Sequence, residues 1–138
     1  MASARRSHDR DRATDSARPA NRRKQLGDFG EQAVASWYTT RGATILDRNW
    51  RVREGEIDLI ALNAGVLSIV EVKTRSSDRY GSPFEAITPT KAARLRRLAG
   101  MWLSSRTDLR YASIQIDVAS VTIDKEGQPV IEVLTLDV

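Results

Sequence analysis

Two apolar segments separated by a short turn constrain the fold more than any other part of the sequence. Residues 55–62 and 66–74 are rich in Val, Ile and Leu, and the Asn-Ala-Gly sequence between them favours a hairpin turn. Strands of this composition lie in the middle of a sheet. Yet the first contains Asp58, and the second contains Glu71 and Lys73. Because removing ions from water is costly, these charges require a partner, and a divalent cation bound by carboxylates is the favoured one.

The length of the turn decides whether the two carboxylates share a face of the sheet. A two-residue loop pairs Asn63 with Val66 and places Asp58 opposite Glu71, on one face. A three-residue loop pairs Asp58 with Val70 and sends the carboxylates to opposite faces, unless a bulge intervenes. We predict an even loop or a bulge.

With that register, oxygen atoms from Asp58, Glu71 and the Val72 carbonyl can bind one Mg²⁺, with water or substrate phosphate as the other ligands. Lys73 lies alongside and can orient a water nucleophile or stabilise the negative charge that develops on a phosphate. Glu56 is a possible auxiliary carboxylate on the same face. The alternative is that Asp58, Glu71 and Lys73 form a cross-strand ion pair on a solvated face.

The composition removes several other chemistries. The chain has 138 residues, enough for one domain, with no cysteine and a single histidine, His8. Thiolate metal sites and disulfides are therefore excluded, and histidine-dependent hydrolysis is disfavoured. The absence of cysteine fits a reducing cytoplasm, where we expect the protein, and no apolar run is long enough to cross a membrane.

The positive charge is concentrated at the N-terminus. Residues 1–24 contain eight basic and three acidic residues, out of 22 and 18 in the whole chain. This segment has no apolar period, so we predict a disordered basic tail over residues 1–24 and a single domain over 25–138. The tail could add phosphate contacts or could be only a solubilising extension.

Hydrophobic periodicity predicts the order helix, three strands, helix, two strands. The pattern indicates helices at residues 25–41 and 88–104, the second beginning at Thr88-Pro89. The expected fold is therefore α/β, with a mixed central sheet flanked by helices. The expected strands are 43–52, 55–62, 66–74, 111–123 and 130–136, with a loop at 75–83.

The charged residues also carry a resemblance. Asp58 followed by Glu71-Val72-Lys73 resembles the D…(E/D)-x-K core of the PD-(D/E)XK nuclease superfamily, although Ile57 stands where the superfamily's name has proline. The wider pattern resembles the YraN family of bacterial proteins, which are related to archaeal Holliday-junction resolvases. It consists of Gly27-Asp28-Phe29-Gly30-Glu31-Gln32-Ala33, Asn49-Trp50-Arg51, Gly55-Glu56-Ile57-Asp58-Leu59-Ile60-Ala61, Val70-Glu71-Val72-Lys73-Thr74-Arg75 and Lys91.

The resemblance implies a restriction-endonuclease-like core and a Mg²⁺-dependent endonuclease, with Mn²⁺ as a substitute, acting on branched or structured DNA. It also implies that Glu31 completes the metal site, a residue that would otherwise be interpreted as a solvated helix position. A homodimer becomes plausible by the same resemblance. The alternative is a non-cleaving nucleic-acid-binding or recombination and repair accessory module that retains the fold, and a third reading is an interaction protein.

Basic and hydroxyl side chains near the predicted metal are candidate DNA contacts. On the second helix Lys91, Arg94 and Arg97 share a flank, which could instead be a solvated face. Asp117, within a later strand, is either a structural polar group or supports the site, and the three tryptophans are interpreted as core or interface anchors. In the loop after the Glu-Val-Lys strand the candidates are Arg75, Arg79, Tyr80 and Ser82, although this loop could be only a turn.

Overall fold

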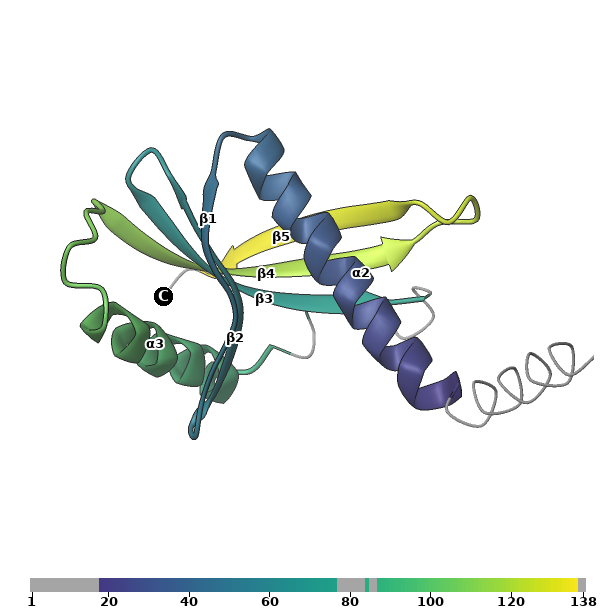
Figure 1. Ribbon diagram of the computed structural model, residues 1–138, viewed down its shortest axis with the longest axis horizontal. Helices are drawn as coiled ribbons and strands as arrows, with labels where there is room; N and C mark the ends of the chain where they lie inside the picture. Colours follow the sequence, from purple (N-terminus) through teal and green to yellow (C-terminus); the bar gives the residue numbers. More distant parts are fainter. Residues whose placement is uncertain (1–17, 77–83, 85–86, 137–138) are drawn as a thin grey trace, which may run out of the picture.

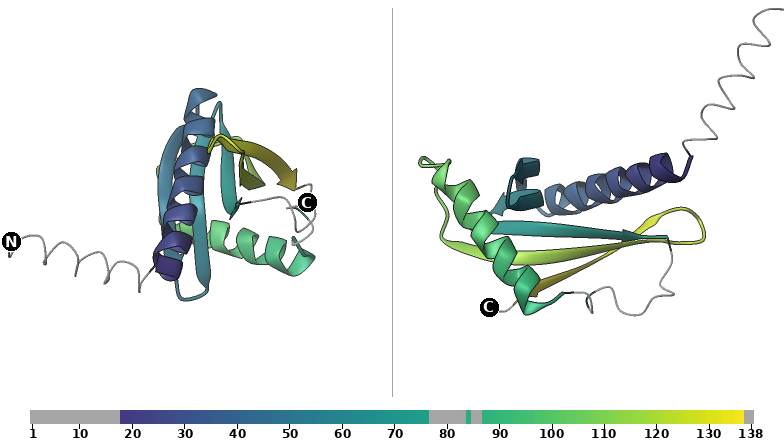
Figure 2. Two further views of the ribbon diagram at one scale, coloured as in Figure 1. Left: turned by 90° about the vertical axis from the view of Figure 1, so that its right-hand side faces the viewer. Right: turned by 90° about the horizontal axis from the view of Figure 1, so that it is seen from below.

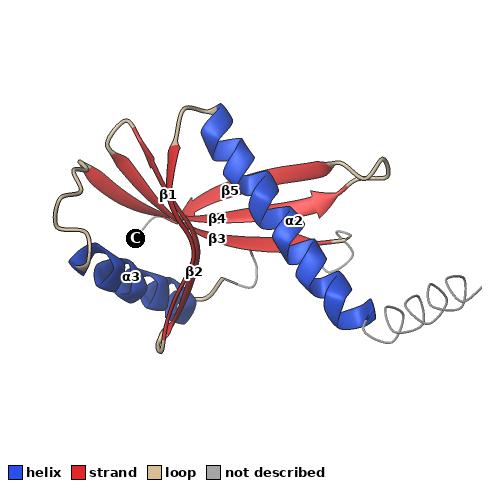
Figure 3. Cartoon of the chain, in the orientation of Figure 1, coloured by secondary structure: helices blue, strands red, loops and turns tan. Residues whose placement is uncertain are grey.

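The computed structural model describes residues 18–76, 84 and 87–136 (Figure 1). The elements follow the predicted order, and Figure 3 distinguishes the helices from the strands by colour. The fold is α/β, as expected. The elements are α2 Arg18–Thr40, β1 Thr44–Val52, β2 Gly55–Asn63, β3 Val66–Arg75, α3 Pro89–Ser104, β4 Ser113–Ile123 and β5 Pro129–Leu136.

The first helix begins earlier than the sequence pattern predicted. Helix α2 starts at Arg18 instead of near residue 25, so the last part of the predicted tail is helical. The side chains of residues 20–25 are exposed, and they therefore lack the apolar period by which a helix is recognised. Residues 1–17 lie outside the described part of the chain.

The strands form one mixed sheet in the order β1-β2-β3-β4-β5. Strands β3 and β4 are parallel and are connected through α3, whereas all the other neighbours are antiparallel. Helix α2 lies along one face of the sheet and α3 across the other (Figure 2). Among the described residues, neither helix is long and apolar enough to cross a membrane.

Each face of the sheet has its own hydrophobic cluster. Val70 of β3 packs in the cluster under α2, and Ile69 packs in the cluster under α3. Burial on both faces explains why the first half of β3 is apolar except for Ser68. Trp102 of α3 is fully buried, as predicted for a core residue, and its Nε1 donates to Oδ2 of Asp47 at 3.0 Å.

The turn between β2 and β3 has the predicted length. Ala64 and Gly65 have φ angles of 49° and 81°, the positive values required by a two-residue hairpin turn. The ladder pairs Asn63 with Val66 and continues in that register to Leu59↔Val70. The prediction of an even loop is therefore confirmed.

Beyond this ladder β2 separates from β3. The last β2–β3 pair is Leu59↔Val70, while β2 remains paired with β1 as far as Gly55. Asn49 of β1 has a φ of 50°, and Asn49 has no partner in the β1–β2 ladder, although the pairs on either side, Arg48↔Leu59 and Trp50↔Ile57, keep one register. Residues two apart in a regular strand share a face of the sheet. Here, however, Leu59 packs under α2 and Ile57 packs under α3. The β1–β2 ribbon thus turns away from β3 (Figure 1). Asp58, which follows the last β2–β3 pair, lies at this branch point.

Candidate functional site

The side chain of Asp58 occupies the branch between β2 and β3. Its Oδ2 accepts a hydrogen bond from the backbone N–H of Val72 at 2.8 Å. This N–H lies just past the last backbone pair, so the carboxylate satisfies a donor that the departing strand no longer reaches. The carboxylate is thereby held against β3 beside Glu71.

Several causes shift the pKa of Asp58. Burial, followed by the charges of Glu31, Glu56 and Glu71, raises this pKa from 3.8 to about 6, although the hydrogen bond from Val72 opposes the rise. Glu31, Glu56 and Glu71 therefore lie near enough to Asp58 for their charges to act on its carboxylate. Negative charge is concentrated around a partly buried carboxylate.

Helix α2 brings Glu31 to this position through a close approach to β3. A Cβ atom on Gly30 would overlap the hydroxyl group of Thr74, so only glycine permits this packing. At Gly27, by contrast, a Cβ atom would meet nothing within 4 Å. Glu31 is partly buried and lines a pocket of about 250 Å³ together with Val72 and Thr74.

Glu71 and Lys73 form an ion pair on β3. The Lys73 Nζ lies 3.6 Å from Oε1 of Glu71, and the side chain of Lys73 is 40% exposed and that of Glu71 21% exposed. This long, partly exposed contact contributes at most about 1 kcal/mol to stability. The alternative of an ion pair among Asp58, Glu71 and Lys73 therefore applies only to Glu71 and Lys73. The Asp58 carboxylate instead accepts a hydrogen bond from the Val72 N–H.

A second pocket, of about 210 Å³, lies between the β1–β2 ribbon and α3. Glu71 and Glu56 line it with the basic side chains of Lys91 and Arg94. Glu56 also forms an ion pair with Arg51, at 3.0 Å. The structure thus places Lys91 and Arg94 beside Glu71.

The other predicted contacts are less informative. Arg75 is the last residue of β3, and Arg79, Tyr80 and Ser82 lie outside the described residues. Arg97 is exposed on α3 and does not line the pocket that contains Lys91 and Arg94.

Asp117 has a structural role. It is 2% exposed and accepts hydrogen bonds from the Tyr38 hydroxyl, the Gln115 amide and the Thr135 hydroxyl. None of these partners is a predicted site residue. A pocket of about 490 Å³ lies beside this network and, although larger than the other two, contains none of the predicted catalytic residues. The candidate site therefore remains the group of carboxylates around Asp58.

Arg23 was not predicted as a site residue. This residue lines the same pocket as Glu31, two helical turns away on α2. The spacing of Arg23, Gly27 and Glu31 at intervals of four was the available signal, because such residues share a helix face. Because the helix was predicted to begin near residue 25, Arg23 was assigned to the tail and this spacing was not recognised.

The donor atoms at the site suit a hard cation. Within the described part of the chain, no three His, Cys, Asp or Glu side chains are arranged to hold a metal ion. Mg²⁺, however, is commonly bound by one or two carboxylates, with water and substrate phosphate as the remaining ligands. Asp58 and Glu71 offer two carboxylates of this kind beside the Val72 peptide, and a cation would offset the charge repulsion that raises the pKa of Asp58.

Comparison with known proteins gives a consistent family. The sequence model of the uncharacterised protein family UPF0102 matches residues 30–121. A UPF0102 protein of Clavibacter michiganensis subsp. michiganensis is 48% identical over 113 residues, covering 82% of this chain and 95% of the relative. Those of Kineococcus radiotolerans and Acidothermus cellulolyticus are 42% and 43% identical, covering 78% and 82% of this chain and 88% and 92% of the relatives. The protein therefore belongs to the UPF0102 family, also called the YraN family.

Proposed function

We propose that the protein is a divalent-metal-dependent endonuclease that hydrolyses DNA phosphodiesters. The observation that carries this proposal is Asp58, a carboxylate fixed by the Val72 N–H among three other carboxylates, with Lys73 on the adjacent strand. Carboxylates grouped around one position favour a hard cation, and a neighbouring ammonium group favours an anionic substrate.

Each residue would have a separate role. Asp58, Glu71 and the Val72 carbonyl would hold Mg²⁺ or Mn²⁺, with Glu31 assisting. The bound ion would supply positive charge that polarises the phosphoryl group. Lys73 would orient the attacking water or stabilise the charge that develops on the phosphate, and its ion pair with Glu71 keeps its ammonium group near the site.

The substrate follows from the resemblance to the archaeal resolvases. Branched or otherwise structured DNA is the expected substrate, and a homodimer is the expected assembly. Lys91 and Arg94, which line the pocket with Glu71, would contact the DNA backbone. Arg75, Arg79, Tyr80 and Ser82 remain predicted contacts from the segment that follows Lys73.

A second candidate function is nucleic-acid binding without cleavage. It is favoured by the basic side chains of Lys91 and Arg94, which line one pocket and can bind phosphates without a metal ion. In this case the same surface would bind branched DNA in a recombination or repair assembly. Intact Asp58, Glu71 and Lys73 favour the enzyme over this alternative.

The test is incubation of the purified protein with flap, four-way-junction and linear duplex DNA in Mg²⁺, Mn²⁺ or EDTA. We expect metal-dependent cleavage of branched substrates, lost in Asp58→Asn, a substitution that preserves the size of the side chain. Glu126→Gln, in the exposed β4–β5 turn, is the control that also removes one negative charge. Metal-independent binding of DNA with no cleavage on any substrate would support the binding module instead.

A further inference from the structure

Asp58 lies between two pockets on opposite faces of the sheet. The first lies on the α2 side, where Glu31 and Val72 line it. The second lies on the α3 side, where Glu56 and Glu71 line it. Asp58 accepts its hydrogen bond from Val72, which lines the α2-side pocket, and the neighbouring residue Glu71 lines the α3-side pocket. The branch between β2 and β3 therefore adjoins both pockets.

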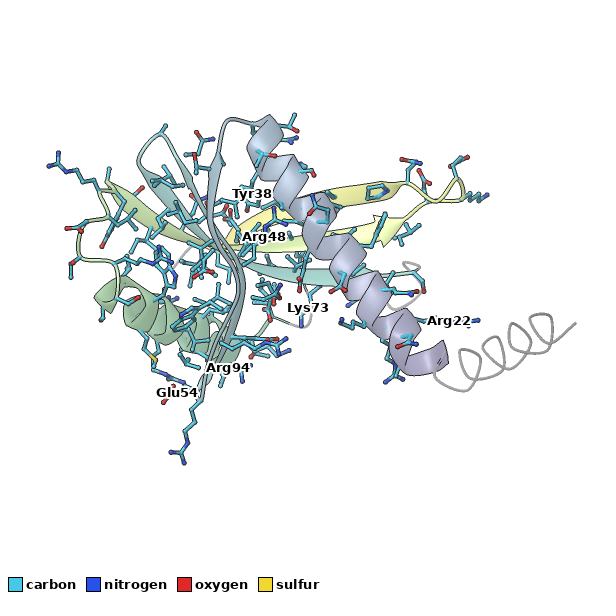
Figure 4. The ribbon with its side chains drawn as sticks, in the orientation of Figure 1. Arg22, Tyr38, Arg48, Glu54, Lys73 and Arg94 are labelled. Carbon is cyan, nitrogen blue, oxygen red and sulfur yellow. The ribbon has the colours of Figure 1, made fainter. Side chains whose placement is uncertain are left out.

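Both pockets combine carboxylates near Asp58 with basic side chains. Lys91 and Arg94 are the basic residues of the α3-side pocket, and Arg23 is the basic residue of the α2-side pocket. In the view of Figure 4, Lys73 lies between Arg94 of α3 and the N-terminal end of α2, marked by Arg22. Basic groups are therefore present on each side of the proposed reaction centre.

We propose that Arg23 binds a backbone phosphate on one side of the scissile bond, while Arg94 and Lys91 bind a phosphate on the other side. The polynucleotide would cross the sheet at the branch point beside Asp58, from the α2 face to the α3 face. This inference rests on the proposed function, because it takes Asp58 as the reaction centre.

The arrangement defines the class of ligand. A single phosphate reaches only one of the two pockets, whereas a phosphodiester chain carries one charge at every nucleotide and reaches both. The ligand is therefore a polynucleotide with residues on each side of the bond that is cut, which makes cleavage internal. The carboxylates between the pockets repel phosphate, so in the absence of metal the attraction comes from the flanking cations.

The salt dependence of binding tests this proposal without requiring cleavage. Fluorescence anisotropy with a labelled single strand of about 20 nucleotides, in EDTA, gives the slope of log Kd against log salt. Each lost phosphate contact lowers the magnitude of that slope by about 0.7 on single strands. We expect this decrease for Arg23→Ala and for Arg94→Ala, and about twice the decrease for the double variant. All variants are made in the full chain, and circular dichroism verifies that they are folded.

The matched control is Arg110→Ala, which removes the same charge. Arg110 is exposed in the loop between α3 and β4, near the end of β3 that lies away from Val72. An unchanged slope in this control, with decreases at Arg23 and Arg94, supports the proposal. A decrease in Arg94→Ala alone would overturn the proposal in favour of a one-sided site. Slopes that are the same in Arg23→Ala, Arg94→Ala and Arg110→Ala would overturn it altogether. If the variants show the expected decreases but the wild-type protein never cleaves DNA, the two-sided binding stands and the proposed hydrolysis fails.

Discussion

Replacement of Asp58 by asparagine should stabilise the metal-free protein at neutral pH. Asparagine retains an oxygen that can accept the Val72 N–H, but it carries no charge. The folded-state pKa of Asp58 is raised from 3.8 to about 6, which corresponds to about 3 kcal/mol between the two protonation states. A group whose pKa is raised on folding contributes stability below its unfolded pKa and loses it as the pH rises through the folded pKa.

The wild type should therefore lose stability relative to Asp58→Asn as the pH rises. From the pKa values of 3.8 and about 6, about 2 kcal/mol of the loss falls between about pH 4.5 and pH 7.5. Urea unfolding followed by tryptophan fluorescence measures the free energy of unfolding at both pH values. EDTA is present, because a bound cation would neutralise the same charge.

Glu126→Gln serves again as the control for loss of a negative charge. Its free energy of unfolding should follow that of the wild type at both pH values. A difference between Asp58→Asn and wild type that stays constant from acidic to neutral pH would refute the electrostatic argument, and so would a change of the opposite sign.

Three further substitutions test the packing and the hydrogen bonds of the fold. Gly30→Ala should lower the free energy of unfolding by about 1–3 kcal/mol through its overlap with Thr74, whereas Gly27→Ala should raise it by up to about 1 kcal/mol, since that position has free space. Urea unfolding compares the two variants, and equal effects would contradict the close approach of α2 to β3. Tyr38→Phe should cost about 1–3 kcal/mol, because buried Asp117 loses a hydrogen bond; an unchanged urea midpoint would count against that network.

Much of the fold could be predicted because its signals are local. Strands β2 and β3 are buried on both faces, which produces continuous apolar runs, and the two-residue turn at Ala64-Gly65 fixes their register. That register predicted Asp58 opposite Glu71, whereas in the structure the ladder ends one pair earlier and Asp58 accepts a hydrogen bond from Val72. Family resemblance was needed for Glu31, because nothing in the sequence of a helix shows which strand it will approach.

Other features depend on three-dimensional arrangement and could not be predicted from pattern. The separation of β2 from β3 involves the positive φ of Asn49 and the hydrogen bond from Val72 to Asp58, which no periodicity records. The helical first turns of α2 are exposed and polar, so the role of Arg23 was hidden in what looked like a tail.

The most direct test of the account is single-turnover cleavage of a labelled four-way junction in Mg²⁺, comparing wild type with Lys73→Met. This substitution leaves Asp58 and Glu71 in place, so DNA binding should persist. We predict that the cleavage rate falls by about 100-fold or more, the loss typical of removing a group that stabilises the transition state. Wild-type cleavage that continues unchanged in Lys73→Met, or that needs no divalent metal, would contradict the account.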